Sequence, residues 1–258
     1  HGGSSPLFRE RHPILTAVPL MAGVKKSSKA TAGGPPYRDD LAFIHDVGFG
    51  HMARGAAEIL LARLPAHRST NRRMVDLGCG SGILSERMAR SGYGVVGYDL
   101  SRAMIERCRQ RVPAGEFHQA SILDAEIPAC SIVAAVGEIV NYLFDPSHSL
   151  VRLTKLIRRV AKSLEPGGLF LVDGAAPGRG LKPGGYQAFR DGPGWFCAFH
   201  AIEESSPPIL TRTITSFVKQ GENYRRDDEV HLLRLIDPAW MRETLASVGL
   251  GVRRIRAY

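Results

Sequence analysis

The chain of 258 residues has no run of apolar residues long enough for a membrane helix, which needs about 20 of them in succession. We therefore expect no membrane span. Its four cysteines are far apart and form no CxxC pair, and no HxxxH or HExxH spacing occurs. The sequence thus shows neither a zinc-binding pattern nor a disulfide framework, and we expect no metal. Separate, reduced cysteines favour a cytoplasmic protein.

The sequence also lacks a long basic run, although its formal net charge is +9. The basic residues are scattered, often as RR pairs, without aromatic residues between them, which is typical of a solvated surface. Net charge bears on association rather than on fold. We therefore do not expect a nucleic-acid partner, although the basic balance leaves RNA as an alternative.

The first 36 residues differ in composition from the rest. The chain begins at His1, and Met21 is a candidate natural start, which would make the preceding residues an addition from cloning. Residues 25–36 (KKSSKATAGGPP) have the Lys/Ser/Gly/Pro composition of a flexible linker. We predict a flexible tail over residues 1–36 and one folded domain over residues 37–258.

From residue 73 onward, short apolar segments alternate with amphipathic ones. Strands are predicted over residues 73–77, 93–98, 116–120, 131–136 and 169–172, and helices over residues 83–90, 102–111 and 150–164. This alternation predicts an α/β fold, with a mostly parallel sheet covered by helices on both faces.

The two ends of the domain follow other patterns. Ala56, Ile59 and Leu60 recur at helical spacing and predict an N-terminal helical cap. Residues 174–194 are rich in glycine and proline and predict a long loop. Residues 195–203, 210–219 and 224–236 are rich in β-branched and aromatic residues and predict a C-terminal antiparallel addition. A helix over residues 238–248 and a strand over residues 252–257 complete the prediction.

The most informative segment is MVDLGCGSG, residues 74–82, in which a strand runs into GxGxG and then directly into a helix. Glycines there allow a sharp turn and close approach of a ligand. Dinucleotide enzymes prefer GxGxxG, with a pyrophosphate at the helix N-terminus. Asp76, two residues before the first glycine, would repel a pyrophosphate but suits a cationic amino-acid ligand. A buried capping acid is the alternative for Asp76.

A second acid, Asp99, ends the next predicted strand. A carboxylate at this position can accept hydrogen bonds from both hydroxyls of a ribose. The alternative is that Asp99 caps the helix that follows.

Four segments in this order resemble the motifs of class I S-adenosylmethionine-dependent methyltransferases, in particular the bacterial small-molecule type. They are VDLGCGSG, GYDLS, SILDAEIP and LEPGGLFLVD. The resemblance implies a Rossmann-like fold and S-adenosyl-L-methionine as cofactor. It also implies one more strand after RRIRAY, so we expect the chain to continue beyond Tyr258.

The resemblance implies a role for each matching residue. Gly78 and Gly80 would face the methionine and ribose portion, Asp99 the ribose and Leu100 the adenine. Residues 121–124, with Leu123 and Asp124, would supply contacts at the adenine edge, and Gly137 would line the methyl-transfer cavity.

Glu138, Asn141 and Tyr142 follow the fourth predicted strand, and open α/β sheets bind ligands at the carboxyl ends of their strands. We regard Glu138 and Tyr142 as candidate catalytic residues that orient the acceptor or remove its proton. Equally, Asn141 and Tyr142 could pack and cap the turn before Asp145. The histidines and acids of the antiparallel part (His200, Glu229 and His231) are more typical of structural roles.

The sequence therefore predicts a methyltransferase that moves the methyl group of S-adenosylmethionine to an N or O nucleophile of a small molecule. The alternatives are an RNA or protein methyltransferase and a SAM-binding protein without turnover. An NAD-dependent dehydrogenase is disfavoured by Asp76 and GxGxG. Residues 37–49 carry Tyr37, His45 and Phe49, and glycines at 48 and 50 interrupt the helical pattern there. This segment is predicted to close over the cofactor as a lid.

Overall fold

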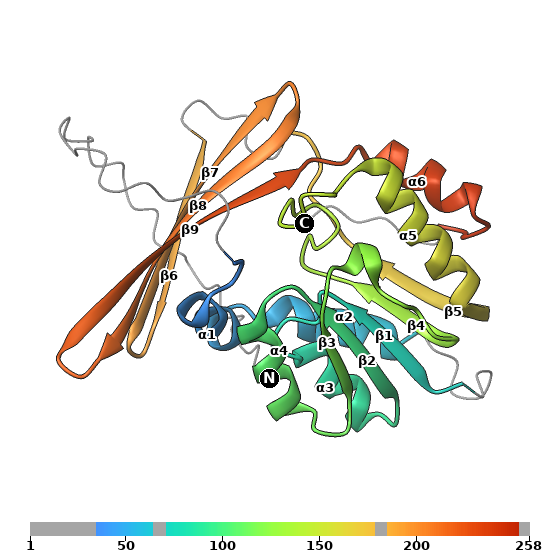
Figure 1. The fold of residues 1–258 in the computed structure, drawn as a ribbon, viewed down its shortest axis with the longest axis horizontal. Coiled ribbons are helices and arrows are strands. Elements are labelled where there is room, and N and C mark those ends of the chain that lie inside the picture. The colour runs from blue at the N-terminus through green and yellow to red at the C-terminus, as the bar shows by residue number, and fades with distance from the viewer. Residues whose placement is uncertain (1–34, 64–70, 179–184, 253–258) are drawn as a thin grey trace, which may run out of the picture.

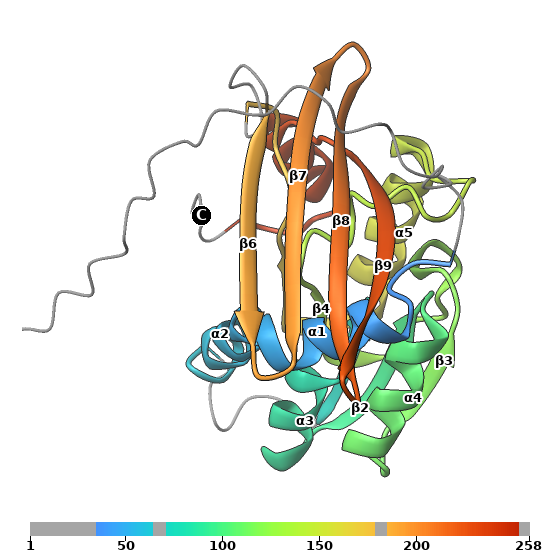
Figure 2. The ribbon, with the colours of Figure 1, turned by 90° about the vertical axis from the view of Figure 1, so that its left-hand side faces the viewer.

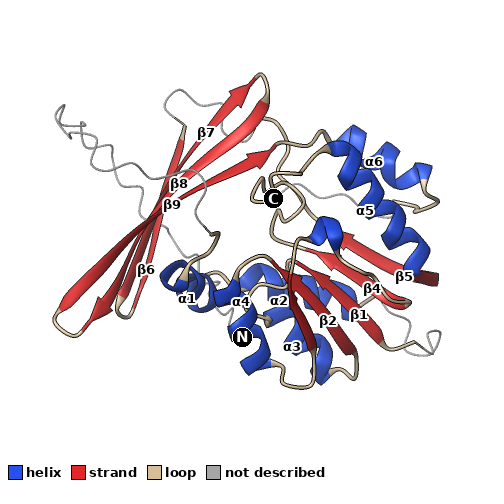
Figure 3. Ribbon diagram, in the orientation of Figure 1, coloured by secondary structure: helices blue, strands red, loops and turns tan. Residues whose placement is uncertain are grey.

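The computed structural model describes residues 35–63, 71–178 and 185–252. The elements in chain order are α1 (Asp39–Gly48), α2 (His51–Leu61), β1 (Arg73–Leu77), α3 (Ile83–Arg90), β2 (Gly94–Asp99), α4 (Arg102–Arg111), β3 (Glu116–Gln119), η1 (Ile122–Asp124), β4 (Cys130–Ala135), α5 (Leu150–Ser163), β5 (Leu164–Val172), β6 (Tyr186–Gly192), β7 (Trp195–Ser205), β8 (Pro208–Gln220), β9 (Asn223–Arg234) and α6 (Pro238–Ser247). They form a parallel sheet covered by helices and a separate antiparallel sheet (Figures 1 and 3).

The parallel sheet has five strands in the order β3-β2-β1-β4-β5, and all of its pairs are parallel. The predicted Rossmann-like α/β fold is confirmed. Strand β4 is buried along its whole length, as its continuous apolar run predicts. Because the order reverses between β1 and β4, the carboxyl ends of these two strands border the crevice where such sheets bind ligands.

Helices cover both faces of the parallel sheet. On one face, α5 contributes the apolar row Leu153, Leu156, Ile157 and Val160, and α6 adds Trp240, Met241 and Leu245. On the other face, α2, α3 and α4 bury Leu60, Met88 and Ile105 against Met74 and Ile132. Burial on both faces explains why these strands read as apolar runs rather than as alternating segments.

The antiparallel sheet has the order β6-β7-β8-β9 and is separate from the parallel sheet, and Figure 2 shows it from its broad side, in front of α1. Strands β7, β8 and β9 confirm the predicted antiparallel addition. The predicted loop over residues 174–194 is wrong in its second half, because Tyr186–Gly192 forms the edge strand β6. This strand pairs on one side only, with β7, and glycine and proline surround it in the sequence, so its alternation is too short to stand out.

Asn141 joins the two sheets. Its side-chain oxygen accepts from the Ala175 N–H at 2.9 Å, and its amide nitrogen donates to the carbonyls of Ala175 and Arg234 at 2.9 and 2.7 Å. Asn141 is fully buried. Its side chain is therefore occupied by the backbone that enters and leaves the antiparallel sheet, rather than by the turn before Asp145.

The N-terminal helix α1 lies between the antiparallel sheet and the parallel part and contacts β6, β7, β8 and α4. Arg225 on β9 forms an ion pair with Asp40, and Arg111 on α4 forms one with Asp46 at 2.6 Å. Among the described residues, no helix has the length and apolarity to cross a membrane. The strand predicted over residues 252–257 lies almost wholly outside the described residues.

Candidate active site

The loop after β1 adopts a conformation that requires glycine. Gly78 has φ +72°, and a Cβ placed there would lie 2.2 Å from the Ile139 side chain. Gly80 has φ +53°, and a Cβ there would meet no atom within 4 Å. At Gly78, therefore, the lack of a side chain makes room for Ile139, whereas at Gly80 it leaves open space beside the backbone.

Asp99 ends β2 beside this loop. Its carboxylate accepts from the N–H of Gly80 at 3.0 Å and from the N–H of Ser101 at 2.8 Å. Burial raises the pKa of Asp99 to about 6, against the lowering effect of these backbone hydrogen bonds. The helix-cap alternative for Asp99 is not observed, because the side chain of Ser101 caps α4 by accepting from Met104 N–H.

Asp76 lies within β1, where only 2% of its surface is exposed. Its carboxylate accepts from the Ser85 hydroxyl at 2.7 Å. Burial raises its pKa to about 6, and the negative charge of nearby Asp99 contributes to the same shift. Two carboxylates thus share a desolvated region below the glycine loop, which is favourable for a cationic ligand.

A hollow opens at the carboxyl ends of the parallel strands. It is lined by Pro36, Tyr37, Gly78, Asp99, Leu100, Ser121, Ile122, Leu123, Ile139, Tyr142, Phe144, Asp145 and His148. Of the predicted cofactor-binding residues, Gly78, Asp99, Leu100 and Leu123 line it. Asp76, Gly80, Asp124 and Gly137 are not among its lining residues, and the exposed side chain of Asp124 forms an ion pair with Arg152 on α5.

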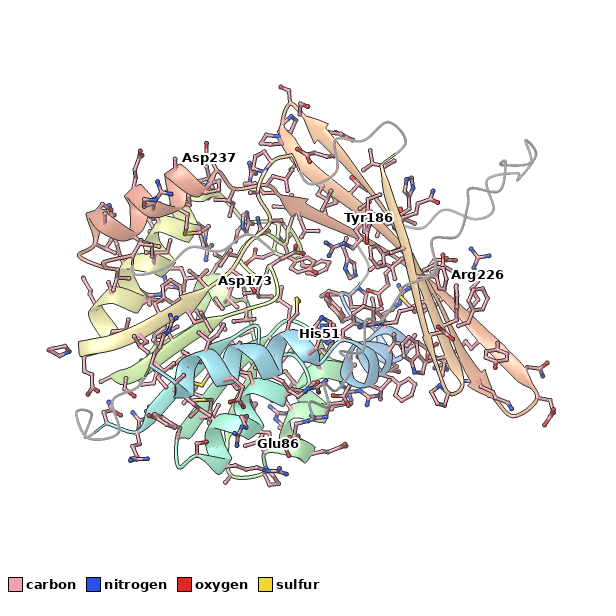
Figure 4. All side chains as sticks on the ribbon, turned by 180° about the vertical axis from the view of Figure 1, so that it is seen from behind. His51, Glu86, Asp173, Tyr186, Arg226 and Asp237 are labelled. Atoms are coloured by element: carbon pink, nitrogen blue, oxygen red, sulfur yellow. The ribbon has the colours of Figure 1, made fainter. Side chains whose placement is uncertain are left out.

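The turn after β4 is held by Asp173 at the end of β5. The Asp173 carboxylate accepts from Gly137 N–H at 2.9 Å and from Glu138 N–H at 2.7 Å. Both turn residues have positive φ, +92° at Gly137 and +61° at Glu138. A non-glycine residue in this conformation stores strain that the surrounding bonds must offset. Figure 4 shows Asp173 in the middle of the molecule, whereas Glu86 and Asp237 lie at its outer sides.

The two predicted catalytic residues are joined by Arg212, which comes from β8 in the antiparallel sheet. Its guanidinium donates to the Glu138 carboxylate at 2.9 Å and to the Tyr142 hydroxyl at 3.2 Å. The Tyr142 hydroxyl is also 3.0 Å from the hydroxyl of Tyr37. Burial is the largest cause raising the pKa of both tyrosines, so both are neutral phenols at pH 7.

Tyr37 is held in place by the antiparallel sheet. The Glu229 carboxylate accepts from the N–H of Tyr37 at 2.9 Å and from the N–H of Arg38 at 2.8 Å. The Ser101 hydroxyl donates to the Tyr37 carbonyl at 2.8 Å. Glu229 also accepts from His231, which is 1% exposed. These two residues therefore have the structural role that the sequence favours, and they anchor the start of the predicted lid.

Sequence patterns alone missed Arg212 and Asp173 as contributors to this site. Arg212 lies on a strand 74 residues beyond its partner Glu138, so no local spacing connects them. Asp173 does follow a predicted strand at its carboxyl end, and that position was a usable signal. His200, by contrast, lies on β7 outside the residues that line the hollow.

Comparison with known proteins shows which protein family this sequence resembles. Residues 74–168 match the family model described as a methyltransferase domain, and these residues contain the glycine loop, Asp99 and the turn after β4. These residues form a methyltransferase domain of the class I S-adenosylmethionine-dependent type. S-adenosylmethionine is the cofactor of this methyltransferase.

The relatives differ in how much of the methyltransferase they match. The dTDP-3-amino-3,4,6-trideoxy-alpha-D-glucopyranose N,N-dimethyltransferase of Streptomyces venezuelae is 26% identical over 78% of this chain and 82% of that protein. A trans-aconitate 2-methyltransferase of Paracidovorax citrulli is 36% identical over 45% of this chain and 43% of that protein. The chain thus spans only about two fifths of the length of some of the curated relatives it matches.

Among solved structures, DesVI of Streptomyces venezuelae superposes with a TM-score of 0.69 and 23% identity. The superposition covers 84% of this chain and 93% of that one. The fold of the methyltransferase is therefore shared over most of its length, beyond the segment that carries the motifs.

Proposed function

We propose that this methyltransferase transfers the methyl group of S-adenosylmethionine to a nitrogen or oxygen nucleophile of a small molecule, in the hollow at the carboxyl ends of its parallel strands. The observation that carries the proposal is that this hollow brings Gly78, Asp99 and Leu100 together with Tyr142.

The residues around the hollow fit the cofactor. The buried Asp99 carboxylate, already oriented by two backbone N–H groups, is suited to accept from the ribose hydroxyls. Leu100 and Leu123 offer apolar contacts to the adenine. The open space beside Gly80 and Gly137, where a Cβ would meet no neighbour, allows close approach of the methionine portion. Asp76 remains a proposed charge partner of the ammonium group.

S-adenosylmethionine supplies an electrophilic methyl group on a good leaving group. The residues of the chain therefore need only bind and orient the acceptor, exclude water, and remove a proton where the acceptor carries one. Tyr142 lines the hollow and has a raised pKa, which suits hydrogen bonding better than proton removal. Glu138 is a carboxylate held by Arg212 next to the same hydroxyl.

The other proposed functions require different sites. An RNA or protein substrate would need a surface that admits a polymer, whereas Pro36 and Tyr37 lie along the edge of the hollow. A SAM-binding protein without turnover would keep the cofactor residues, yet it would have no use for the Glu138–Arg212–Tyr142 group. The small-molecule proposal is also supported by the amino-sugar methyltransferase, a relative whose match extends over most of the chain.

The proposal is tested by an acceptor screen with S-adenosylmethionine labelled on its methyl group. The panel contains amino-sugar nucleotides, small carboxylic acids, phenols, total RNA and a peptide mixture. Transfer of label to one of the small molecules is the expected result. Transfer to RNA or peptide alone would replace the proposal. Tight binding of S-adenosylhomocysteine without transfer to any class would favour the binding protein.

A further inference from the structure

We propose that Arg212 is a positioning residue of the acceptor site, which fixes the hydroxyl of Tyr142 so that the Tyr142–Tyr37 pair meets the acceptor as a hydrogen-bond donor. The inference rests on the proposed function, because it concerns the same hollow. It assigns a part in the chemistry to the antiparallel sheet, which lies outside the matched methyltransferase segment.

The first step of the argument is the hydrogen-bonding capacity of the groups. A guanidinium has five N–H donors and no acceptor, so the contact from Arg212 at 3.2 Å can only be a donation to the Tyr142 oxygen. This contact occupies a lone pair of that oxygen. The side chain of Arg212 is only 18% exposed, so water competes little for the contact.

The second step is to count hydrogens. The hydroxyls of Tyr142 and Tyr37 together carry two hydrogens, and one of them lies in the 3.0 Å hydrogen bond between the two oxygens. In the part of the chain that the structure describes, no other side chain is recorded as accepting the second hydrogen. Both residues line the hollow, so this hydrogen is available to a ligand there.

The third step is that Arg212 restricts the rotation of the Tyr142 hydroxyl. Without it, the Tyr142 hydroxyl could rotate and present a lone pair to the hollow in place of the hydrogen. With the guanidinium in place, one of the two lone pairs of the Tyr142 oxygen is already used, and the tyrosine pair is biased toward donation. The acceptor should therefore carry an oxygen or a neutral nitrogen that can accept a hydrogen bond beside its nucleophilic atom.

Glu138 completes the arrangement. Its carboxylate accepts from the same guanidinium at 2.9 Å and is 10% exposed. It balances the charge of Arg212 in this buried region, and it fixes the direction of the guanidinium fork that reaches Tyr142. The strained backbone of Glu138, with φ +61°, is in turn held by Asp173.

The test uses the full chain labelled with ¹³C at the Cζ carbon of tyrosine, a nucleus whose chemical shift responds to hydrogen bonding at the hydroxyl. The Tyr142 resonance is assigned as the one lost in Tyr142→Phe. We expect Arg212→Met to move it, and Arg212→Lys to move it as well, because one ammonium cannot span two oxygens as the fork does. Arg226→Met, which removes an exposed ion pair with Asp228 on β9, is the matched control and leaves the resonance in place.

Loss of the buried charge could destabilise the fold, so Arg212→Met is also combined with Glu138→Gln, which removes both charges. If Arg212 served only to pair with Glu138, this double variant would recover the melting temperature and the wild-type Tyr142 resonance. The proposal expects the melting temperature to recover but the resonance to stay shifted. An unshifted resonance in either variant overturns the proposal.

A kinetic cycle with the acceptor found in the screen adds a second readout. Arg212→Met should lower kcat/KM by about tenfold, equivalent to about 1.4 kcal/mol, and much less in the Tyr142→Phe background. Losses that simply add would show that Arg212 does not act through Tyr142. The affinity for S-adenosylhomocysteine, measured by calorimetry, should remain the same throughout. The resonance test requires no turnover, so failure of this inference is distinguishable from failure of the proposed function.

Discussion

The backbone N–H of Gly80 donates to the carboxylate of Asp99 at 3.0 Å. The glycine loop after β1 and the end of β2 are therefore fixed to one another, and the Asp99 carboxylate has a defined orientation before any ligand arrives. Such preorganisation reduces the ordering that ligand binding must otherwise impose.

Replacing Asp99 with alanine should weaken binding of S-adenosylhomocysteine by about 1–3 kcal/mol, because the ribose hydroxyls lose their partner. Asp124→Ala is the matched control, since Asp124 is exposed, pairs with Arg152 and does not line the hollow. Titration calorimetry gives both affinities. An equal loss in the two variants would return Asp124 to the site, and no loss at Asp99 would remove Asp99 from it.

The affinity for S-adenosylhomocysteine should fall as the pH decreases through about 6. Asp99 has a pKa of about 6, and protonation takes away a carboxylate that hydrogen-bonds to the ligand. Calorimetry between pH 5 and 8 would measure the dependence. Asp99→Asn should bind weakly with a flatter profile over the same range, and an equally steep profile in this variant would assign the dependence to another group.

The free energy of unfolding should depend on the same two acids, but it should decrease with rising pH, whereas the affinity for the ligand increases. The pKa values of Asp76 and Asp99 are raised to about 6 in the fold, so the native state binds more protons than the unfolded chain between about pH 4 and 6. Their contribution to the free energy of unfolding therefore decreases as the pH rises through that window. His45, whose pKa burial lowers to about 4, acts in the other direction. The effect of the acid is therefore isolated by comparing the free energy of unfolding of wild type with that of Asp76→Asn, measured by denaturant titration. The difference between the two should narrow as the pH falls toward 4, because Asp76 is then protonated and uncharged like the asparagine.

Gly78→Ala should destabilise the protein, because the position has φ +72° and the new Cβ would overlap Ile139. Overpacking of this kind costs about 1–3 kcal/mol, in addition to about 1 kcal/mol for the left-handed backbone. Gly80→Ala meets no neighbour and should lose only the second amount. Thermal denaturation distinguishes the two. Ile139→Ala should partly rescue Gly78→Ala, and a lack of rescue would place the cause of the loss elsewhere.

Glu138→Gln and Tyr142→Phe should both lower turnover while leaving cofactor affinity nearly unchanged. They should differ in stability. Glu138→Gln leaves the buried Arg212 without a counter-charge, a change that costs about 3–5 kcal/mol when a buried pair is broken. Tyr142→Phe keeps that pair and should be milder. A loss of cofactor binding in either variant would show that the residue belongs to the cofactor side.

The lid over residues 37–50 should become slower in amide hydrogen exchange when S-adenosylhomocysteine binds. Glu229→Gln weakens the anchor of Tyr37 and Arg38, and it should speed exchange in the unliganded lid. Removing residues 1–35, which leaves Pro36 at the hollow, should keep the affinity intact, whereas removal through residue 50 should weaken it about tenfold, or about 1.4 kcal/mol. Unchanged exchange together with unchanged affinity would reduce α1 to a packing helix.

The parallel half was predictable from sequence because its determinants are local. Strands such as β4, buried on both faces, are continuous apolar runs, and the glycines of the loop follow directly after β1. The contacts that join segments distant in the sequence were not predictable. Tyr37 meets Tyr142, and Glu138 meets Arg212, only after two sheets have been brought together, and no periodicity encodes such pairings. Strand β6 was missed because an edge strand needs little apolar alternation.

The hydrogen bonds of the Asn141 side chain place the start and the end of the antiparallel sheet next to each other in space. At the same place, the Ile236 N–H donates to the Ala175 carbonyl at 3.0 Å. An insert whose two ends lie this close closes without stretching its host, as inserted domains do. The segment that begins at Ala175 and ends at Arg234 therefore has the topology of an inserted domain. Recombination or grafting between such enzymes could replace the half that meets the acceptor as one unit, and the machinery that holds the methyl donor would stay as it is.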